Sequence, residues 1–214
     1  MSEISTGASG QRVNKLGSFQ SKFLEMDEKQ SRYDGTQLRS LYAYLEHGLL
    51  GDSVVAWIGP CDVGFEHMVD GEDLRDASAI RGSQMLHFIV EKFEARLPEM
   101  VALQRLMSAI AKDLLETSRK TKGSLRRDGD DLYWKSDSSA TEEGKLSISI
   151  ATVSPVSGLI HFAINVSNQG TPVKTASLED LGLEPKAFAK ALLAKLVSEF
   201  DSISSATRKV KWVN

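Results

Sequence analysis

Two neighbouring stretches in the second half of the chain constrain its fold most. Residues 144–150 (GKLSISI) and 158–166 (GLIHFAINV) alternate apolar and polar side chains, and a short segment rich in Ser, Pro and Gly joins them. A period of two indicates a β-strand with one buried face. The apolar positions are even-numbered in both stretches, so we predict a hairpin that pairs even with even residues. This register places five polar residues on the opposite face: Lys145, Ser147, Ser149, His161 and Asn165.

The bulk properties are typical of a globular protein. We expect residues 1–18, which are rich in Ser, Gly and Gln, to be a disordered extension, and residues 19–214 to form a single domain. The net charge of -3 gives no electrostatic case for nucleic acid. No apolar run approaches the roughly 20 residues needed to span a bilayer. The chain has one cysteine and no apolar signal-peptide segment, so we expect it in the cytoplasm. The sequence is also compatible with a homodimer.

Outside the hairpin, strand and helix patterns follow one another without regular alternation. The predicted strands cover residues 23–32, 53–58 and 124–134, the last interrupted by Asp128-Gly129-Asp130. Three helices are predicted: one capped by Thr36 and ended by Gly48, one that begins at Pro98, and one that begins at Pro185. Residues 66–79 read as loop with a short helical turn, and residues 85–93 fit either a strand or a helix. This order favours an α+β fold over a doubly wound parallel sheet.

Cys61 is the first candidate for chemistry. It lies in Gly59-Pro60-Cys61-Asp62-Val63-Gly64, which we expect to be an exposed loop at a strand end. A thiolate there would be a nucleophile, although Asp62 beside it would raise the thiol pKa unless a cation were near. The alternative is a small buried hydrophobic residue.

Histidines and acidic residues provide a second set of candidates. His67 and Asp70 could run acid–base chemistry or bind a ligand, whereas Glu72 and Asp73 are expected to be solvated loop residues. Their spacing fits no metal template, so no metal site is predicted. His87 stands among apolar neighbours, where a hydrogen-bonded core histidine is the alternative to a functional one.

Two basic residues could hold an anion. Arg39 could bind a carboxylate or phosphate by a bidentate fork, or be an ordinary surface arginine. Lys145, beside Gly144 at the start of a strand, could reach an anion across a cavity mouth and stabilise developing charge, or be exposed.

The hairpin resembles that of the biotin/lipoate protein ligase and lipoyl transferase superfamily. Gly144-Lys145-Leu146 and His161-Phe162-Ala163-Ile164-Asn165-Val166 match its lysine-bearing strand and its Asn-Val strand. Arg127-Asp128, Asp131-Leu132 and the segment 177–182 are similar to flanking segments of these proteins. The resemblance implies a single α+β domain with a mixed, largely antiparallel sheet flanked by helices. The Gly- and Arg-rich adenylate loop is replaced by Gly59-Pro60-Cys61-Asp62-Val63, which argues against ATP-dependent adenylation.

From about Tyr33 the chain also resembles the prokaryotic family called domain of unknown function 366. The matching segments are Tyr33-Asp34-Gly35-x-Gln37-Leu38-Arg39, Gly59-Pro60-Cys61-Asp62-Val63, Met68-Val69-Asp70, Met85-Leu86-His87-Phe88-Ile89 and residues 149–157. This resemblance implies a link to 7-deazaguanine metabolism.

We therefore expect an enzyme that acts on the carboxylate of a small heterocyclic acid, such as a decarboxylase of 7-carboxy-7-deazaguanine type. Cys61, Asp62, Lys145 and His161 are the predicted catalytic residues. The predicted substrate-binding residues are Arg39, His67, Asp70, His87, Ser147, Ser149 and Asn165. No cofactor is required in this hypothesis. The alternatives are ligase-like acyl activation or transfer, and a non-catalytic ligand-binding module.

Overall fold

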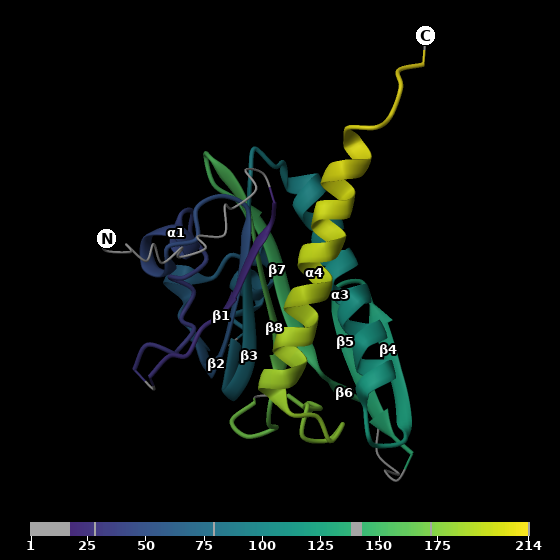
Figure 1. Ribbon diagram of the computed structural model, residues 1–214. Helices are drawn as coiled ribbons and strands as arrows, with labels where there is room; N and C mark the ends of the chain where they lie inside the picture. Colours follow the sequence, from purple (N-terminus) through teal and green to yellow (C-terminus); the bar gives the residue numbers. More distant parts are fainter. Residues whose placement is uncertain (1–17, 28, 79, 138–142, 172, 214) are drawn as a thin grey trace, which may run out of the picture.

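A five-stranded sheet forms the centre of the protein (Figure 1). The computed structural model describes residues 18–27, 29–78, 80–137, 143–171 and 173–213, so the predicted extension at residues 1–18 lies almost entirely outside the described residues. In spatial order the strands are β1 (Gln20–Phe23), β2 (Ser53–Val63), β3 (Ile80–Phe93), β8 (Ser157–Asn165) and β7 (Ser147–Val153). β1 runs parallel to β2, and the other neighbouring pairs are antiparallel.

A smaller antiparallel sheet lies beside the large one. It contains β4 (Gly123–Asp128), β5 (Asp131–Ser136) and β6 (Gly144–Lys145). Leu146 joins the two sheets: its amide donates to the carbonyl of Leu132 at 2.7 Å, and its carbonyl accepts from the amide of Asn165 at 3.0 Å. Lys145 and Ser147, expected on one strand, therefore belong to different sheets.

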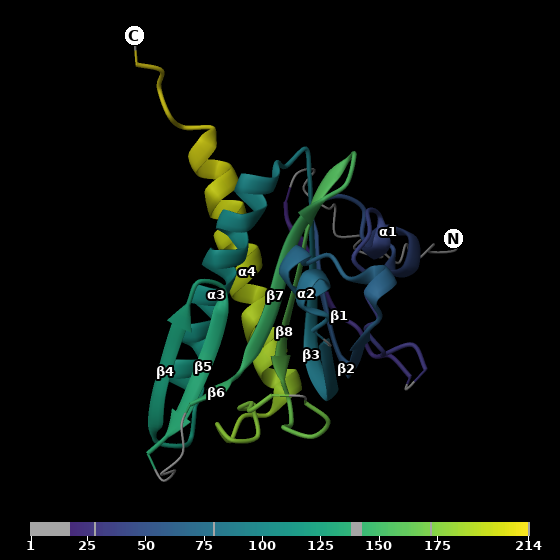
Figure 2. The ribbon, with the colours of Figure 1, turned by 180° about the vertical axis from the view of Figure 1, so that it is seen from behind.

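The helices lie on both faces of the large sheet. Two long helices, α3 (Leu97–Ser118) and α4 (Pro185–Thr207), cover one face (Figure 1). The opposite face, seen in Figure 2, carries α1 (Tyr42–His47), η1 (Phe65–His67) and α2 (Gly71–Asp76). Within the described residues, no helix is both long enough and apolar enough to cross a membrane.

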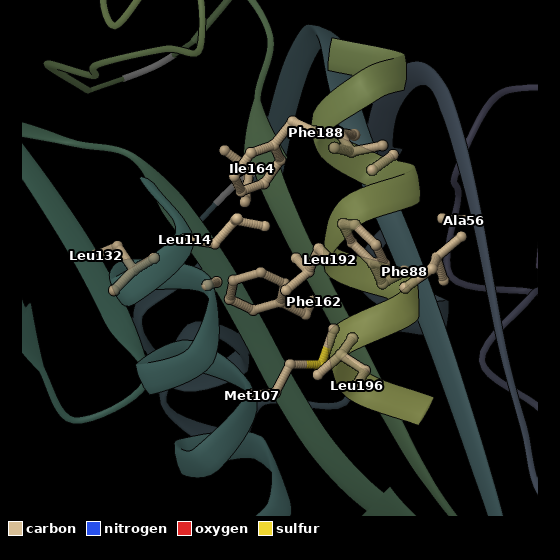
Figure 3. Packing of buried hydrophobic residues seen from close by; sticks show 14 of the residues in the cluster. Ala56, Phe88, Met107, Leu114, Leu132, Phe162, Ile164, Phe188, Leu192 and Leu196 are labelled. Atoms are coloured by element: carbon tan, nitrogen blue, oxygen red, sulfur yellow. The ribbon is translucent and has the colours of Figure 1, made fainter. Parts of the chain in front are cut away.

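The larger core lies between the sheet and the two long helices. Figure 3 shows Phe88 and Phe162 of the sheet directed toward Leu192 and Leu196 of α4. The two phenyl rings lie 6.1 Å apart, and all four side chains are fully or almost fully buried. Each buried aromatic or leucine side chain contributes roughly 1.5–3 kcal/mol through removal of apolar surface from water. This packing fixes one face of the sheet, and the other face carries a smaller apolar cluster together with His87, His161 and Asn165.

The predicted strands of the hairpin are confirmed, but their predicted register is wrong. Ser147 pairs with Ile164, Ser149 with Phe162, and Ile150 with His161, so odd residues lie beside even ones. The turn is the reason: Ser154 donates its amide to the carbonyl of Ser157 at 2.7 Å. This bond leaves two central residues in the turn, and two residues set an odd-to-even pairing. The serines therefore lie on the helix-covered face, away from His161.

Two N-terminal predictions are also wrong. The expected strand at 23–32 is instead β1, which ends at Phe23, and Asp27 then turns the chain by accepting from the amides of Lys29 and Gln30. Thr36 does not cap a helix, because its amide and hydroxyl both bond to Asp34. The helix begins later, at Tyr42, and ends at Gly48 as predicted. Residues 85–93, for which both alternatives were open, belong to β3.

A buried carboxylate holds the segment before α1 against the sheet. Glu91 of β3 is 2 % exposed and accepts from the amide of Leu41 at 2.8 and 3.0 Å and from the hydroxyl of Ser157 at 2.7 Å. Leu41 has a φ of 64°, an unfavourable backbone conformation for a leucine. The hydrogen bonds to Glu91 therefore stabilise a strained residue.

Glu91→Ala is expected to lower the free energy of unfolding by about 2–3 kcal/mol, since the buried hydroxyl of Ser157 and the partly buried amide of Leu41 lose their acceptor. Urea denaturation checks this result. Glu99→Ala is the matched control, because Glu99 makes an exposed ion pair with Lys92, at 3.1 Å, worth less than about 1 kcal/mol. Equal losses in the two variants would contradict the role given to Glu91.

Candidate functional site

A pocket opens on the face of the large sheet that α3 and α4 leave uncovered. Its volume is about 260 Å³, at the small end of ligand sites. Its lining comes from α2, β3, β6, β7 and β8, together with Ser78, Thr171, Val173 and Thr175. The lining residues are Asp73, Ser78, Ile80, Arg81, Met85, Lys145, Ile148, Asn165, Thr171, Val173 and Thr175. We call it the Lys145 pocket.

Lys145 stands between two carboxylates. Its ammonium Nζ lies 2.8 Å from Asp131 Oδ2, and both side chains are about one-third to one-quarter exposed. Asp73 approaches from α2: burial and the neighbouring Asp70 raise the pKa of Asp73, and the charge of Lys145 partly opposes this rise. The pocket therefore combines an oriented cation with a carboxyl that holds a proton more readily than an ordinary aspartate.

A second cation reaches the pocket from the first residues of β3. Arg81 lies opposite Asp62 of β2, and its Nε donates to Asp62 Oδ1 at 3.0 Å. The Nη1 of Arg32 lies 3.6 Å from the other oxygen of Asp62. Asp62, a predicted catalytic residue, thus contacts the lining residue Arg81 and orients it.

Asn165 positions the lysine strand. Its Nδ2 donates to the carbonyls of Lys145 and Ala176, each at 3.1 Å. Gly144 packs against this same segment, and a Cβ there would lie only 2.5–2.7 Å from the backbone of Thr175 and Ala176. The side chain predicted to bind substrate therefore lines the pocket and fixes the backbone of Lys145.

Cys61 differs from its expected state. It was predicted in an exposed loop, but it lies within β2, is 2 % exposed, and packs with Tyr33, Trp57 and Met85. Burial, and then the charge of Asp62, raise the pKa of the Cys61 thiol to about 12. The thiolate needed for a nucleophile is disfavoured at neutral pH, and Cys61 does not line the Lys145 pocket.

His87 and His161 form a buried pair on the same face. His87 Nε2 lies 3.1 Å from the carbonyl of Gly59, which can only accept, so this nitrogen carries the proton. His87 Nδ1 then accepts from His161 Nε2 at 3.1 Å. Tyr33 covers the pair, its ring stacked on His161 with centroids 3.7 Å apart. Neither histidine lines the Lys145 pocket.

Stability is expected to fall in acid because of this pair. Burial lowers the pKa of His87 to about 4 and that of His161 well below its usual value. The unfolded chain takes up the proton of His87 near pH 6.5, whereas the folded chain does not until about pH 4. The lowered pKa of His161 acts in the same direction. The free energy of unfolding should therefore decrease between pH 6.5 and pH 4, by about 3 kcal/mol for His87 alone.

Urea denaturation across this pH range measures the loss. The double variant His87→Leu/His161→Leu should show a flatter acid dependence, and His67→Gln, on exposed η1, should keep that of the wild type. An unchanged slope in the double variant would show that other groups cause the acid loss.

The remaining predicted residues lie elsewhere. Arg39 bonds to Glu46 at 2.7 Å and lies over Tyr42 in a separate cleft of about 580 Å³. Asp70 caps α2 by accepting from the amides of Glu72 and Asp73, and His67 is exposed.

Ser147 and Ser149, predicted beside His161, instead serve the junction between the sheets. Ser147 Oγ accepts from the amide of Leu132 at 2.9 Å. Ser149 Oγ contacts Asp130 at 2.7 Å and Gln104 at 2.8 Å. Both are structural contacts on the helix-covered side.

Sequence reasoning missed three residues of this site. Asp73 was expected to be solvated but lines the pocket; Arg81 and Asp131 were not singled out as site residues. The strand pairing of Tyr133 with Lys145 is the signal that places Asp131 near the lysine, and it is visible only once the small sheet is formed. Among the described residues, no cluster of three His, Cys, Asp or Glu side chains is arranged to hold a metal ion.

Known proteins resemble this chain at two levels. The uncharacterized protein MJ0805 of Methanocaldococcus jannaschii is 33 % identical over 184 residues, which cover 83 % of this chain and 79 % of that protein. A solved structure of a protein of unknown function from Pyrococcus horikoshi is 40 % identical, covers 91 % of this chain and 100 % of its own, and superposes with a TM-score of 0.80.

Solved structures of ligases share this fold. Biotin protein ligase from Aquifex aeolicus, solved in complex with biotin and ATP, matches 84 % of this chain and 68 % of its own with a TM-score of 0.50 and 17 % identity. This likeness confirms the predicted biotin/lipoate ligase-like α+β fold. The model of the family called domain of unknown function 366 matches residues 23–211. The chain therefore belongs to the domain of unknown function 366 family.

Proposed function

We propose that the protein is an enzyme that removes the carboxylate of a small heterocyclic acid as CO2, with 7-carboxy-7-deazaguanine as the first substrate to test. One observation carries the proposal: the Lys145 ammonium, held 2.8 Å from Asp131, faces a pocket of about 260 Å³ together with Arg81 and Asp73. The family resemblance suggests the deazapurine class, and the pocket suggests a small anionic ligand.

The pocket lining suits a flat ring with an acidic substituent. Ile80, Met85 and Ile148 provide apolar surface for the ring. Lys145 and Arg81 provide the two positive charges that would bind the carboxylate. The pocket is small, so the ligand would be bound close to these cations.

The chemical step needs one acid. A proton moves from Asp73 to the ring carbon that bears the carboxylate; the bond to the carboxylate then breaks, its electron pair returns to the ring, and CO2 leaves. The raised pKa of Asp73 favours this role. Asp73 replaces the buried Cys61 thiol as the candidate proton donor. One proton enters and one CO2 leaves, so the step balances without another reactant.

The test is CO2 release from 7-carboxy-7-deazaguanine, with 7-deazaguanine identified by mass spectrometry. Asp73→Asn should lower kcat by about 10²-fold or more, since it removes the acid. Glu66→Gln, which changes an exposed carboxylate of η1, is the control and should retain full activity. Absence of CO2 from a properly folded protein would reject the decarboxylase, and tight binding without turnover would favour a binding module.

Acyl activation is the second candidate, because the fold is shared with a biotin protein ligase solved with biotin and ATP. Such a ligase would exchange labelled pyrophosphate into ATP when its acid is present. The assay should use biotin, lipoate and 7-carboxy-7-deazaguanine separately. Acid-dependent exchange would favour acyl activation over decarboxylation.

A further inference from the structure

A second hollow adjoins the Lys145 pocket. This open groove of about 690 Å³ is lined by Tyr133, Lys135, Glu143, Lys145, Val173 and Lys174. Lys145 and Val173 line both spaces, so the groove begins where the pocket ends. We call it the lysine groove.

The lysine groove is rich in positive charge. Three lysines line it, whereas its carboxylate, Glu143, is bound by Arg126 through bonds of 2.6, 3.0 and 3.2 Å. These bonds lower the pKa of Glu143, so it stays ionised and neutralised by its partner. Lys135 makes no ion pair with any residue that the structure describes. Three ammonium groups thus line the groove beside one carboxylate that Arg126 already binds.

The strand pairing sets the order of the groups along the groove. Tyr133 lies directly opposite Lys145, and Lys135 follows two residues later on the same side of β5. A ligand that leaves the pocket past Lys145 and Val173 would therefore meet the Tyr133 ring and then Lys135. An aromatic and apolar stretch followed by lysines suits a sugar followed by a phosphate.

We infer that the substrate is a nucleotide: its carboxylated ring occupies the Lys145 pocket and its 5′-phosphate binds Lys135 and Lys174 in the lysine groove. This inference rests on the proposed function for the identity of the ring acid. The phosphate site is tested separately, by measuring the affinity of the protein for each ligand. Recognition of phosphate by flexible lysines also predicts that affinity decreases with salt.

Calorimetric titration tests the inference with three ligands: 7-carboxy-7-deazaguanine, its ribonucleoside and its ribonucleoside 5′-monophosphate. The monophosphate should bind at least about 10-fold more tightly than the ribonucleoside, a gain expected from charge-assisted contacts to two lysines. The variant Lys135→Met/Lys174→Met should abolish this gain and leave the affinity for the base unchanged. Lys195→Met, an exposed lysine of α4, is the control and should retain the gain.

The outcomes separate the two proposals. Equal affinity for nucleoside and monophosphate, a gain that survives in the double variant, or no binding of any of the three ligands would overturn the nucleotide inference. CO2 release from the base together with equal affinities would leave the proposed function standing alone. Lysine-dependent binding of the monophosphate without CO2 release would support the phosphate site and reject the decarboxylase.

Discussion

Lys145→Met is expected to lower kcat/KM for decarboxylation by about 10²–10³-fold, the usual effect of removing one oriented charge from a reacting site. Methionine keeps an unbranched side chain as far as Cε but removes the ammonium. The substrate carboxylate would lose its cation. Asp131, whose Oδ2 lies 2.8 Å from the Lys145 ammonium in the wild type, would lose its partner and repel the substrate. Arg81 alone would then hold the anion. This side chain is 65 % exposed and already forms an ion pair with Asp62, so it would bind the anion weakly. Steady-state kinetics of CO2 release measure the change.

Two controls make this result specific to the pocket. Lys195→Met removes an exposed lysine from α4 on the far side of the sheet and should leave kcat/KM unchanged. Circular dichroism should show that Lys145→Met is folded, because the ion pair is partly exposed and worth less than about 1 kcal/mol. A folded Lys145→Met variant with nearly normal kcat/KM would remove Lys145 from the proposed chemistry.

Gly59→Ala is expected to cause the largest loss of stability, about 3 kcal/mol, because the added methyl has no space. A Cβ at residue 59 would overlap the backbone carbonyl of Ser31. That carbonyl accepts from Trp57 Nε1 at 2.8 Å, and the neighbouring Tyr33 is tied to β2 by its amide, 2.8 Å from the carbonyl of Pro60. The methyl would push the segment outward and break these bonds.

Urea denaturation of Gly59→Ala measures this loss. Gly71→Ala is the matched control: a methyl group added at this residue, at the start of α2, would have no neighbouring atom within 4 Å, and stability should change by less than about 1 kcal/mol. The Gly59→Ala variant should also expose the Tyr33–Trp57 cluster, which tryptophan fluorescence would detect. A loss at residue 59 no larger than that at residue 71 would show that the Ser31 segment yields easily.

Much of the fold follows from local patterns in the sequence. The alternation in residues 144–150 and 158–166 predicts the hairpin strands, and proline with helical spacing predicts α3 and α4. The pairing between strands is different, because a turn one residue longer or shorter reverses the faces. The bond between Ser154 and Ser157 decides that question, and the apolar pattern alone does not reveal it.

The site was predictable only where its residues belong to a local pattern. Lys145 and Asn165 were found from the hairpin, and both line the pocket. Asp73 and Arg81 come from α2 and β3, far away in the chain, and no local pattern reports that they meet there. Cys61 was misplaced because a Gly-Pro sequence suggested a loop, whereas β2 continues through a bulge at Gly59 and Cys61. Irregularities within strands are invisible to periodicity.

Leu146 has a consequence for how this pocket could change during evolution. The candidate lysine belongs to the small sheet, but most of the apolar floor belongs to the large one, and one residue connects them. Leu132 and Trp134, which pack the small sheet on the core, do not line the pocket. Substitutions at such hidden positions would tilt one sheet against the other and move the ammonium relative to the floor. Substrate preference could thus drift while every residue that touches the ligand stays the same.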